Sequence, residues 1–240
     1  MSKFKSTPFY LLLMLGTIFC NHSSGQDQTD PTSKERKKVL ILGDSISMGY
    51  TATVRSELKS IADVFRPTNA KGRPENCAGT LNGVKQLDRW LKIEGGNFDV
   101  IHFNFGLHDL KRVNGETGKN SNDPNDPRQS EPDKYKERLQ EIVKKLKATN
   151  AKLIYATTTP VPKGKMRPHR DTTDPERYNK IAAEIMKENE IEVNDLFAFA
   201  NERLEKIQRP ANVHFTKEGS VELGKQVAEK IRGALKEESK

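Results

Sequence analysis

The chain has 240 residues, a length that suits a single domain with a sizeable buried core. Its formal net charge at pH 7 is +8, but the lysines and arginines are interspersed with acidic residues along the sequence. No stripe of basic residues interleaved with aromatic ones is present. The composition therefore excludes a typical nucleic-acid-binding domain and indicates a solvated surface of mixed charge, with no nucleic-acid partner expected.

The first 25 residues have the layout of a secretory signal peptide. Lys3 and Lys5 precede an apolar run over residues 9–20, and small polar residues follow at 23–25. A run of roughly 12 apolar residues is too short to span a bilayer comfortably, so an uncleaved anchor is the weaker interpretation. We therefore expect residues 1–25 to be removed from an exported protein, periplasmic or secreted, with no membrane span afterwards.

The two cysteines bear on the same region. Cys20 leaves with the signal peptide, so Cys77 remains alone and no intramolecular disulfide is expected. Lipid attachment at Cys20 is a further interpretation, weakened because Phe19 is bulky where a small residue is usual. The polar residues 26–36 are expected to form a flexible leader.

The domain expected over residues 37–240 alternates between strands and helices. Strands are predicted at 39–42, 63–67, 98–105, 152–158 and 191–194, and helices at 48–61, 81–93, 133–148, 175–188, 197–207 and 217–235. Strands that alternate with helices of this length indicate an α/β fold with a parallel sheet covered on both faces. The ligand site of such a sheet lies beyond the carboxyl ends of its strands.

One segment breaks the alternation. Residues 111–132 are rich in Asn, Asp, Gly, Pro and Ser and lack apolar periodicity. The segment follows directly on the strand that ends near Gly106, which places it at the expected ligand edge. It is either a disordered excursion or a lid that faces the substrate.

The first strand runs straight into Gly43-Asp44-Ser45. Gly43 permits a sharp turn, and Ser45 then stands where the N–H groups of the next helix favour a developing negative charge. The alternative is that Ser45 merely caps that helix.

A histidine follows about 170 residues later, in Asn212-Val213-His214-Phe215-Thr216. Thr216 has the character of a helix start, so His214 lies in a loop just before the last helix. A lone histidine in such a loop is often only a surface residue. If His214 reaches Ser45, however, the pair has the minimum equipment for acyl transfer through a covalent intermediate.

Two middle segments complete a pattern. Gly79 lies in a loop before a predicted helix, and Gly106-Leu107-His108-Asp109 ends a buried strand. With Gly43-Asp44-Ser45 and His214, these segments resemble, in order and over most of residues 37–236, the sequence blocks of the SGNH hydrolases, also called the GDSL esterase family.

The resemblance implies a three-layer α/β/α sandwich with a five-stranded parallel sheet, flavodoxin-like in its topology. It also implies that Ser45 is the nucleophile and His214 the base. The oxyanion hole would combine the N–H groups of Ser45 and Gly79 with the third-block side chain, here His108. Asp44, Asp109 and Asn212 are expected as neighbours of the site.

The sequence departs from the family pattern at two positions. His108 stands where the third block normally has asparagine; a ring N–H could donate the same hydrogen bond, or the residue could be a packed structural histidine. Ala211 stands where an aspartate normally orients the catalytic histidine. A backbone carbonyl, Asn212 or an acid elsewhere would have to orient His214 instead.

A basic loop adds Arg167, His169, Arg170 and Asp171, which either contact an anionic or sugar substrate or are solvated. No metal-binding or nucleotide-binding motif occurs in the sequence, so neither a metal nor a cofactor is expected.

The sequence thus predicts an exported serine esterase that hydrolyses carboxylic esters, acetyl esters of carbohydrates in particular. The rival hypothesis is a non-catalytic carbohydrate-binding relative with a degenerate site.

Overall fold

The computed structural model describes residues 36–237, so the predicted signal peptide and nearly all of the predicted leader lie outside the described residues. The strands are β1 (Lys37–Leu42), β2 (Ala62–Phe65), β3 (Val100–Phe103), β4 (Lys152–Ala156) and β5 (Glu192–Asn194). The helices are α1 (Ser45–Leu58), α2 (Thr80–Trp90), α3 (Pro132–Lys147), α4 (Asp174–Glu188), α5 (Leu196–Asn201), α6 (Leu204–Ile207) and α7 (Lys217–Glu237), with a short 3₁₀ turn, η1 (Ile93–Gly95).

The five strands form one parallel sheet in the order β2-β1-β3-β4-β5. This is the flavodoxin-like order, in which the chain reverses direction across the sheet beside β1. The central strand β3 is completely buried, as expected for a strand with helices over both faces. The predicted fold class is confirmed.

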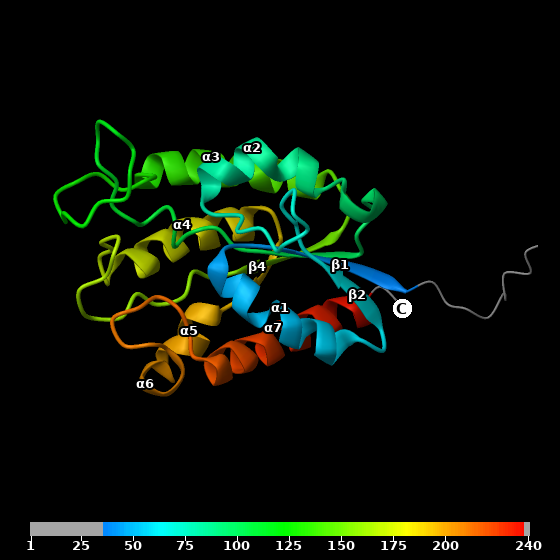
Figure 1. Cartoon of the computed structure of the whole chain (residues 1–240). Coiled ribbons are helices and arrows are strands. Elements are labelled where there is room, and N and C mark those ends of the chain that lie inside the picture. The colour runs from blue at the N-terminus through cyan, green and yellow to red at the C-terminus, as the bar shows by residue number, and fades with distance from the viewer. Residues whose placement is uncertain (1–35, 238–240) are drawn as a thin grey trace, which may run out of the picture. The chain divides into compact units, whose positions relative to one another are not determined.

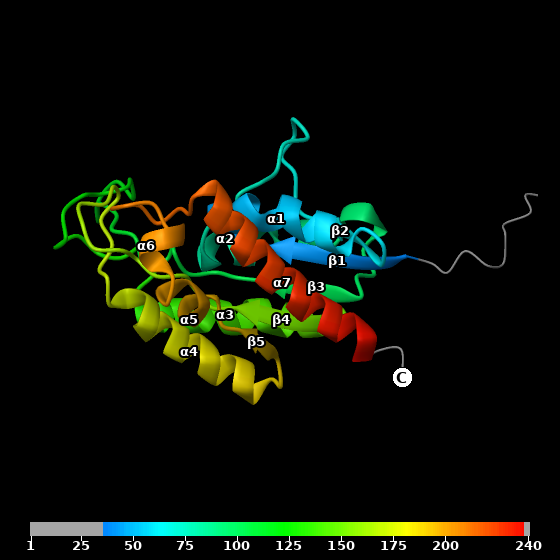
Figure 2. The same ribbon diagram turned by 90° about the horizontal axis from the view of Figure 1, so that it is seen from below.

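Helices cover both faces of the sheet, which gives three layers (Figure 1). Helices α1 and α7 pack against each other on one face, while α2, α3 and α4 pack in succession on the other. Glycine at position 224 permits a close α1–α7 contact. A Cβ atom there would lie only 2.6 Å from Cβ of Thr53. Figure 2 shows α7 crossing the sheet beside α1.

Two helix boundaries differ from the predictions for local reasons. Helix α1 begins at Ser45 rather than Met48, because the Asp44 carboxylate accepts the Ile46 N–H at 2.9 Å and caps the helix. The single helix predicted over 197–207 is interrupted after α5. The carbonyl of Ile207, at the end of α6, accepts the Thr216 N–H at 2.8 Å, which holds α6 against the segment before α7.

The loops that follow the strands gather at one end of this domain. The green loop after β3, the yellow-green loop after β4 and the orange segment before α7 lie together at the left in Figures 1 and 2. No helix among residues 36–237 is long and apolar enough to cross a membrane.

Candidate active site

Ser45 lies at the point where β1 gives way to α1. The backbone turns at Gly43, where a Cβ atom would lie 3.0 Å from Ser47, so a larger residue would disturb the turn. Ser45 is the first residue of α1, and its N–H has no acceptor among the described residues. The serine therefore combines an accessible hydroxyl with an unpaired backbone donor at the positive end of a helix dipole.

The structure brings His214 to this serine. The two residues are 169 positions apart in the sequence, but Ser45 Oγ lies 2.9 Å from His214 Nε2. This is hydrogen-bond distance, and it is the geometry that a general base requires to remove a hydroxyl proton.

Asn212 supplies the orienting group that the sequence left open. Its Oδ1 lies 2.7 Å from His214 Nδ1 and also accepts the His214 backbone N–H at 2.9 Å. Because the backbone N–H can only donate, it fixes Oδ1 rather than Nδ2 toward the ring. His214 Nδ1 must then carry the proton, and Nε2 is left as an acceptor for the Ser45 hydroxyl.

The protonation state of His214 suits this arrangement. Partial burial lowers the pKa of His214 below its ordinary value, and the positive charges of Arg209 and Arg170 lower it further. The imidazole is therefore neutral at neutral pH, as a base must be before it accepts a proton.

His108 faces the same cavity. Its ring makes no hydrogen bond within the described part of the chain, so its polar atoms are free for a ligand. Burial lowers the pKa of His108 to about 4, with further lowering by Lys111, Arg170 and His214. A neutral ring has one N–H donor, and such a donor could stabilise an oxyanion.

Gly79 and Asp109 lie together at the start of α2, outside the lining of the cavity. Asp109 is fully buried and accepts the Thr80 N–H at 3.0 Å and the Thr80 hydroxyl at 2.6 Å, which anchors the start of α2. A Cβ atom at Gly79 would lie 2.8 Å from the Asp109 carboxylate. Gly79 thus permits α2 to dock on Asp109, and its N–H, unpaired among residues 36–237, stays a predicted oxyanion donor.

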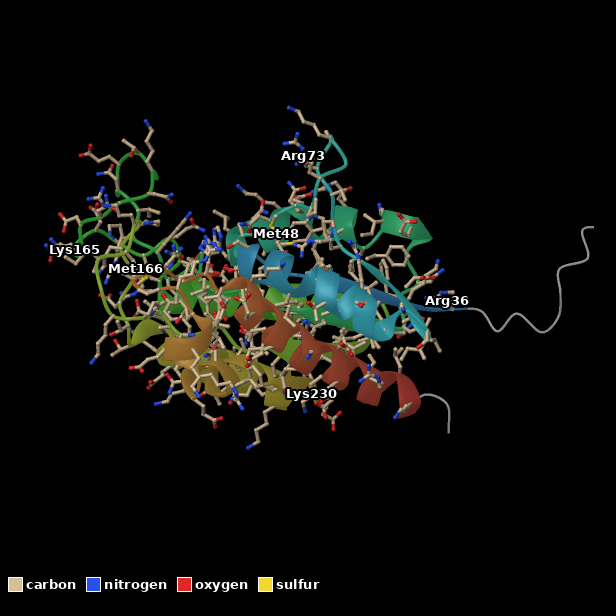
Figure 3. All side chains as sticks on the ribbon, turned by 60° about the horizontal axis from the view of Figure 1, so that its bottom comes forward. Arg36, Met48, Arg73, Lys165, Met166 and Lys230 are labelled. Atoms are coloured by element: carbon tan, nitrogen blue, oxygen red, sulfur yellow. The ribbon has the colours of Figure 1, made fainter. Side chains whose placement is uncertain are left out.

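A cavity of about 550 Å³ opens above the Ser45–His214 pair. Its lining comes from the loop ends of several elements: Asp44, Ser45, Asn76, residues 107, 108 and 111, Asn120, residues 165–168 and 170, and residues 211–214. Figure 3 shows Lys165 and Met166 at the loop-bearing end of the domain. Of the predicted site residues, Asp44, His108 and Asn212 line the cavity, whereas Gly79 and Asp109 do not.

The sequence matches the GDSL-like lipase/acylhydrolase family over residues 41–220. The chain belongs to this family. The match spans the stretch from the end of β1 to the start of α7 and includes both Ser45 and His214. No curated protein matches the sequence.

Several solved structures share the fold. An acetyl xylan esterase, AlAXEase, is 18% identical with a TM-score of 0.58, and the match covers 79% of this chain and 97% of that one. A lipase/acylhydrolase from Enterococcus faecalis is 21% identical with a TM-score of 0.62 and coverage of 82% and 96%. An acetylxylan esterase from Geobacillus stearothermophilus is 16% identical, again with a TM-score of 0.62 and coverage of 81% and 94%.

The loop after β3 is an ordered wall of this family member's cavity. Its two arms pair with each other, and Arg112 N–H also donates to the His169 carbonyl at 2.9 Å. The Arg128 side chain makes a two-point ion pair with Asp174, at 2.6 and 2.9 Å. Lys111, at the start of the loop, lines the cavity. Of the two interpretations of residues 111–132, the structure favours the substrate-facing one.

One buried residue that the sequence pattern does not single out, Arg66, holds the site together. The Arg66 guanidinium donates to the carbonyls of Gly43 and Glu75 at 3.3 and 2.8 Å, and to Thr51 Oγ1 at 2.8 Å. It thereby links the end of β2 to the turn before Ser45 and to the loop before Gly79. The only available signal was an arginine within an otherwise strand-like segment.

No group of three or more His, Cys, Asp or Glu side chains is placed to hold a metal ion in residues 36–237.

Proposed function

We propose that this GDSL-family ester hydrolase is an exported serine esterase that hydrolyses carboxylic esters, acetyl esters of carbohydrates in particular. The single observation that carries the mechanism is the 2.9 Å contact between Ser45 Oγ and His214 Nε2, with Asn212 behind the ring. Family membership supports the ester-hydrolase class.

In this mechanism His214 Nε2 removes the proton from Ser45 Oγ as the oxygen attacks the ester carbonyl carbon. The carbonyl oxygen becomes an oxyanion that the Ser45 N–H and a His108 N–H stabilise, together with the predicted Gly79 donor. The tetrahedral intermediate then collapses, the ester C–O bond breaks, and His214 gives the proton to the leaving alcohol. Water, deprotonated by His214, attacks the acyl-enzyme, so that the acid is released and Ser45 regains its proton.

The saccharide substrate is supported by two observations. Two of the fold neighbours described above carry the names acetyl xylan esterase and acetylxylan esterase. The cavity is lined mainly by polar and charged side chains, which suits a hydroxyl-rich alcohol better than a long acyl chain. Export is supported by the N-terminal sequence alone, in the residues outside the described part.

The rival hypothesis, a carbohydrate-binding relative without activity, would gain support from a His214 that lies more than about 4 Å from Ser45 and has no orienting partner. Neither condition holds, since Asn212 takes the place of the missing aspartate. The geometry therefore favours catalysis.

Hydrolysis of p-nitrophenyl acetate by the purified protein tests the proposal. Ser45→Ala should lower kcat by on the order of 10⁵-fold or more, because no other group can form the acyl-enzyme. Ser56→Ala, an exposed serine on the same helix, is the matched control and should keep wild-type turnover. Equal turnover by Ser45→Ala and wild type would remove Ser45 from the role of nucleophile.

Acetate release from acetylated xylooligosaccharides, measured alongside fatty-acid release from a triglyceride, tests the saccharide. Preference for the triglyceride would contradict the carbohydrate assignment while leaving the serine esterase intact.

A further inference from the structure

The cavity above Ser45 has a strongly one-sided charge. Within the described part of the chain, four basic side chains line it, from Lys111, Lys165, Arg167 and Arg170, and a single acidic one, from Asp44. These basic residues come from two loops that are far apart in the sequence. Two hydrogen bonds tie the loops together, from the Arg112 N–H to the His169 carbonyl and from the His169 N–H to the Ser121 carbonyl. A saccharide without charge would not need such a lining.

Arg170 is the most informative of the four. It is only 8% exposed, yet no carboxylate lies within 4 Å of its guanidinium among the described residues. Its Nε donates to the Leu107 carbonyl at 2.7 Å, and Nη1 reaches the Pro168 carbonyl at 3.4 Å. The remaining N–H groups have no acceptor among residues 36–237, and the side chain lines the cavity.

The neighbouring arginines, unlike Arg170, each have an ion-pair partner. Arg112 makes an ion pair with Asp171, and Arg128 makes one with Asp174. Asp171 Oδ1 also lies 3.1 Å from His169 Nε2, so both aspartates already have partners other than Arg170. Arg170 is thus left unpaired where carboxylates stand close by in the sequence.

Asp44 offsets the charge of Arg170 only in part, because it attracts the guanidinium without forming an ion pair with it. Its carboxylate accepts the Ile46 N–H, and burial raises its pKa. Arg170 and Asp44 attract each other, but the pair makes no contact within 4 Å. Burial lowers the pKa of Arg170 to about 10, so the guanidinium remains charged at neutral pH.

A buried cation without a counter-ion is costly, and a bound anion offsets that cost. A guanidinium also presents its free N–H groups in a planar fork that fits a carboxylate or a sulfate. Lys111 is half-buried and Lys165 exposed, and neither makes an ion pair among the described residues. They can therefore add attraction to the same anion.

We propose that the ester substrate of this site is an anionic saccharide, whose carboxylate or sulfate group binds Arg170 with help from Lys111 and Lys165 while its acetyl ester lies at Ser45. This inference rests on the proposed esterase function. It narrows the substrate from acetylated carbohydrates in general to those that carry a uronic acid or a sulfate ester near the acetyl group.

Three acetate esters that differ only at the sixth carbon provide the test: an acetylated methyl galactoside, its galactosiduronate and its 6-sulfate. One charge-assisted contact contributes about 1.5–3 kcal/mol. The galactosiduronate or the 6-sulfate should therefore have a kcat/KM at least about tenfold above that of the neutral galactoside. High salt should reduce this preference because it screens the charges. The ester with the higher kcat/KM, the galactosiduronate or the 6-sulfate, shows whether the natural saccharide carries a carboxylate or a sulfate.

For each variant, kcat/KM for the anionic ester is divided by kcat/KM for the neutral ester, and this ratio is compared with that of the wild type. Arg170→Gln should bring the ratio close to one. Lys165→Gln, which changes only an exposed side chain, should lower it severalfold even if Arg170→Gln fails to fold. Lys163→Gln is the matched control: it removes one charge from the same loop without lining the cavity, and it should keep the wild-type ratio.

A wild-type ratio of one or less, with the neutral ester hydrolysed, would overturn the anionic substrate and leave the esterase proposal standing. If the enzyme hydrolyses no ester at all, the esterase proposal fails. Calorimetric titration with a galacturonate oligosaccharide and with a neutral galactose oligosaccharide then decides the inference separately. Equal affinity for the two would refute it, and tighter binding of the galacturonate would support it.

Discussion

Asn212 determines which nitrogen of His214 is free to act as a base, and its removal is the most direct test of the proposed mechanism. In Asn212→Ala the ring loses its only polar partner besides Ser45 among the described residues, and the tautomer is no longer fixed. The fold should survive, because the side chain lies at the cavity surface rather than in the core.

The magnitude follows from the 2.7 Å contact between Asn212 Oδ1 and His214 Nδ1. This hydrogen bond strengthens when His214 becomes an imidazolium in the transition state, and a bond to a charged group contributes about 1.5–3 kcal/mol. At about 1.4 kcal/mol for each factor of ten, Asn212→Ala should lower kcat roughly 10- to 150-fold.

Asn212→Asp should act in the opposite direction. A carboxylate makes a hydrogen bond roughly twice as strong as a neutral amide, so kcat/KM should rise by up to about tenfold. The negative charge also favours the imidazolium and raises the pKa of His214. The acid limb of the pH profile, which the lowered pKa of His214 places below the ordinary histidine range in the wild type, should then move to higher pH.

The assay is kcat/KM for p-nitrophenyl acetate between about pH 5 and pH 9, with thermal unfolding as a check on the fold. Full wild-type kcat in Asn212→Ala would refute the orienting role. An acid limb that stays at the same pH in Asn212→Asp would show that His214 is not the group that titrates.

Three further changes test other parts of the structure. His108→Asn should keep or raise kcat, while His108→Ala should lower kcat on p-nitrophenyl acetate by about 10²–10³-fold, as expected when an oxyanion donor is lost; equal effects of both would indicate a packing role. Gly106→Ala should destabilise the fold by about 1–3 kcal/mol and lower Tm by several degrees in calorimetry, because its Cβ would collide with the Thr158 side chain; an unchanged Tm would contradict the close contact. Arg128→Gln should cost about 3–5 kcal/mol in denaturant unfolding, since it leaves the buried Asp174 carboxylate unpaired, whereas a loss below 1 kcal/mol would mean that the ion pair is not structural.

The sheet was predictable because its signal is local and repeated. Each strand is a short apolar run and each helix has an apolar face, so the alternation alone indicates a parallel α/β sheet. The apolar periodicity predicts a start of α1 at Met48, whereas the helix begins at Ser45 because the Asp44 side chain caps it at Ile46.

The site was partly predictable from its motifs. Ser45 and His214 were identified because each stands where a strand or loop meets a helix. The sequence does not identify the partner of His214, although Asn212 is only two residues away, because it does not show the positive φ of 48° at Ala211, just before Asn212. Ala211→Asp, suggested by the family pattern, should therefore bring no gain in rate.

The order of the 111–131 loop was not predictable, because its stabilising contacts are non-local. Arg112 and Arg128 pair with Asp171 and Asp174, carboxylates that lie more than 40 residues further along the chain. No periodicity in the loop itself reports these contacts. The same holds for the unpaired state of Arg170, which depends on which carboxylates its neighbours have taken.

The close packing of α1 on α7 makes catalysis sensitive to the separation of these two helices. Ser45 begins α1 and His214 immediately precedes α7, and these helices approach each other through Gly224 and, near the site, through Gly49 and Ser220. A small separation of the two helices would widen the 2.9 Å contact while the sheet stayed intact. Ester turnover is thus a local reporter of this helix pair, and during denaturation it should disappear before the circular dichroism of the sheet changes.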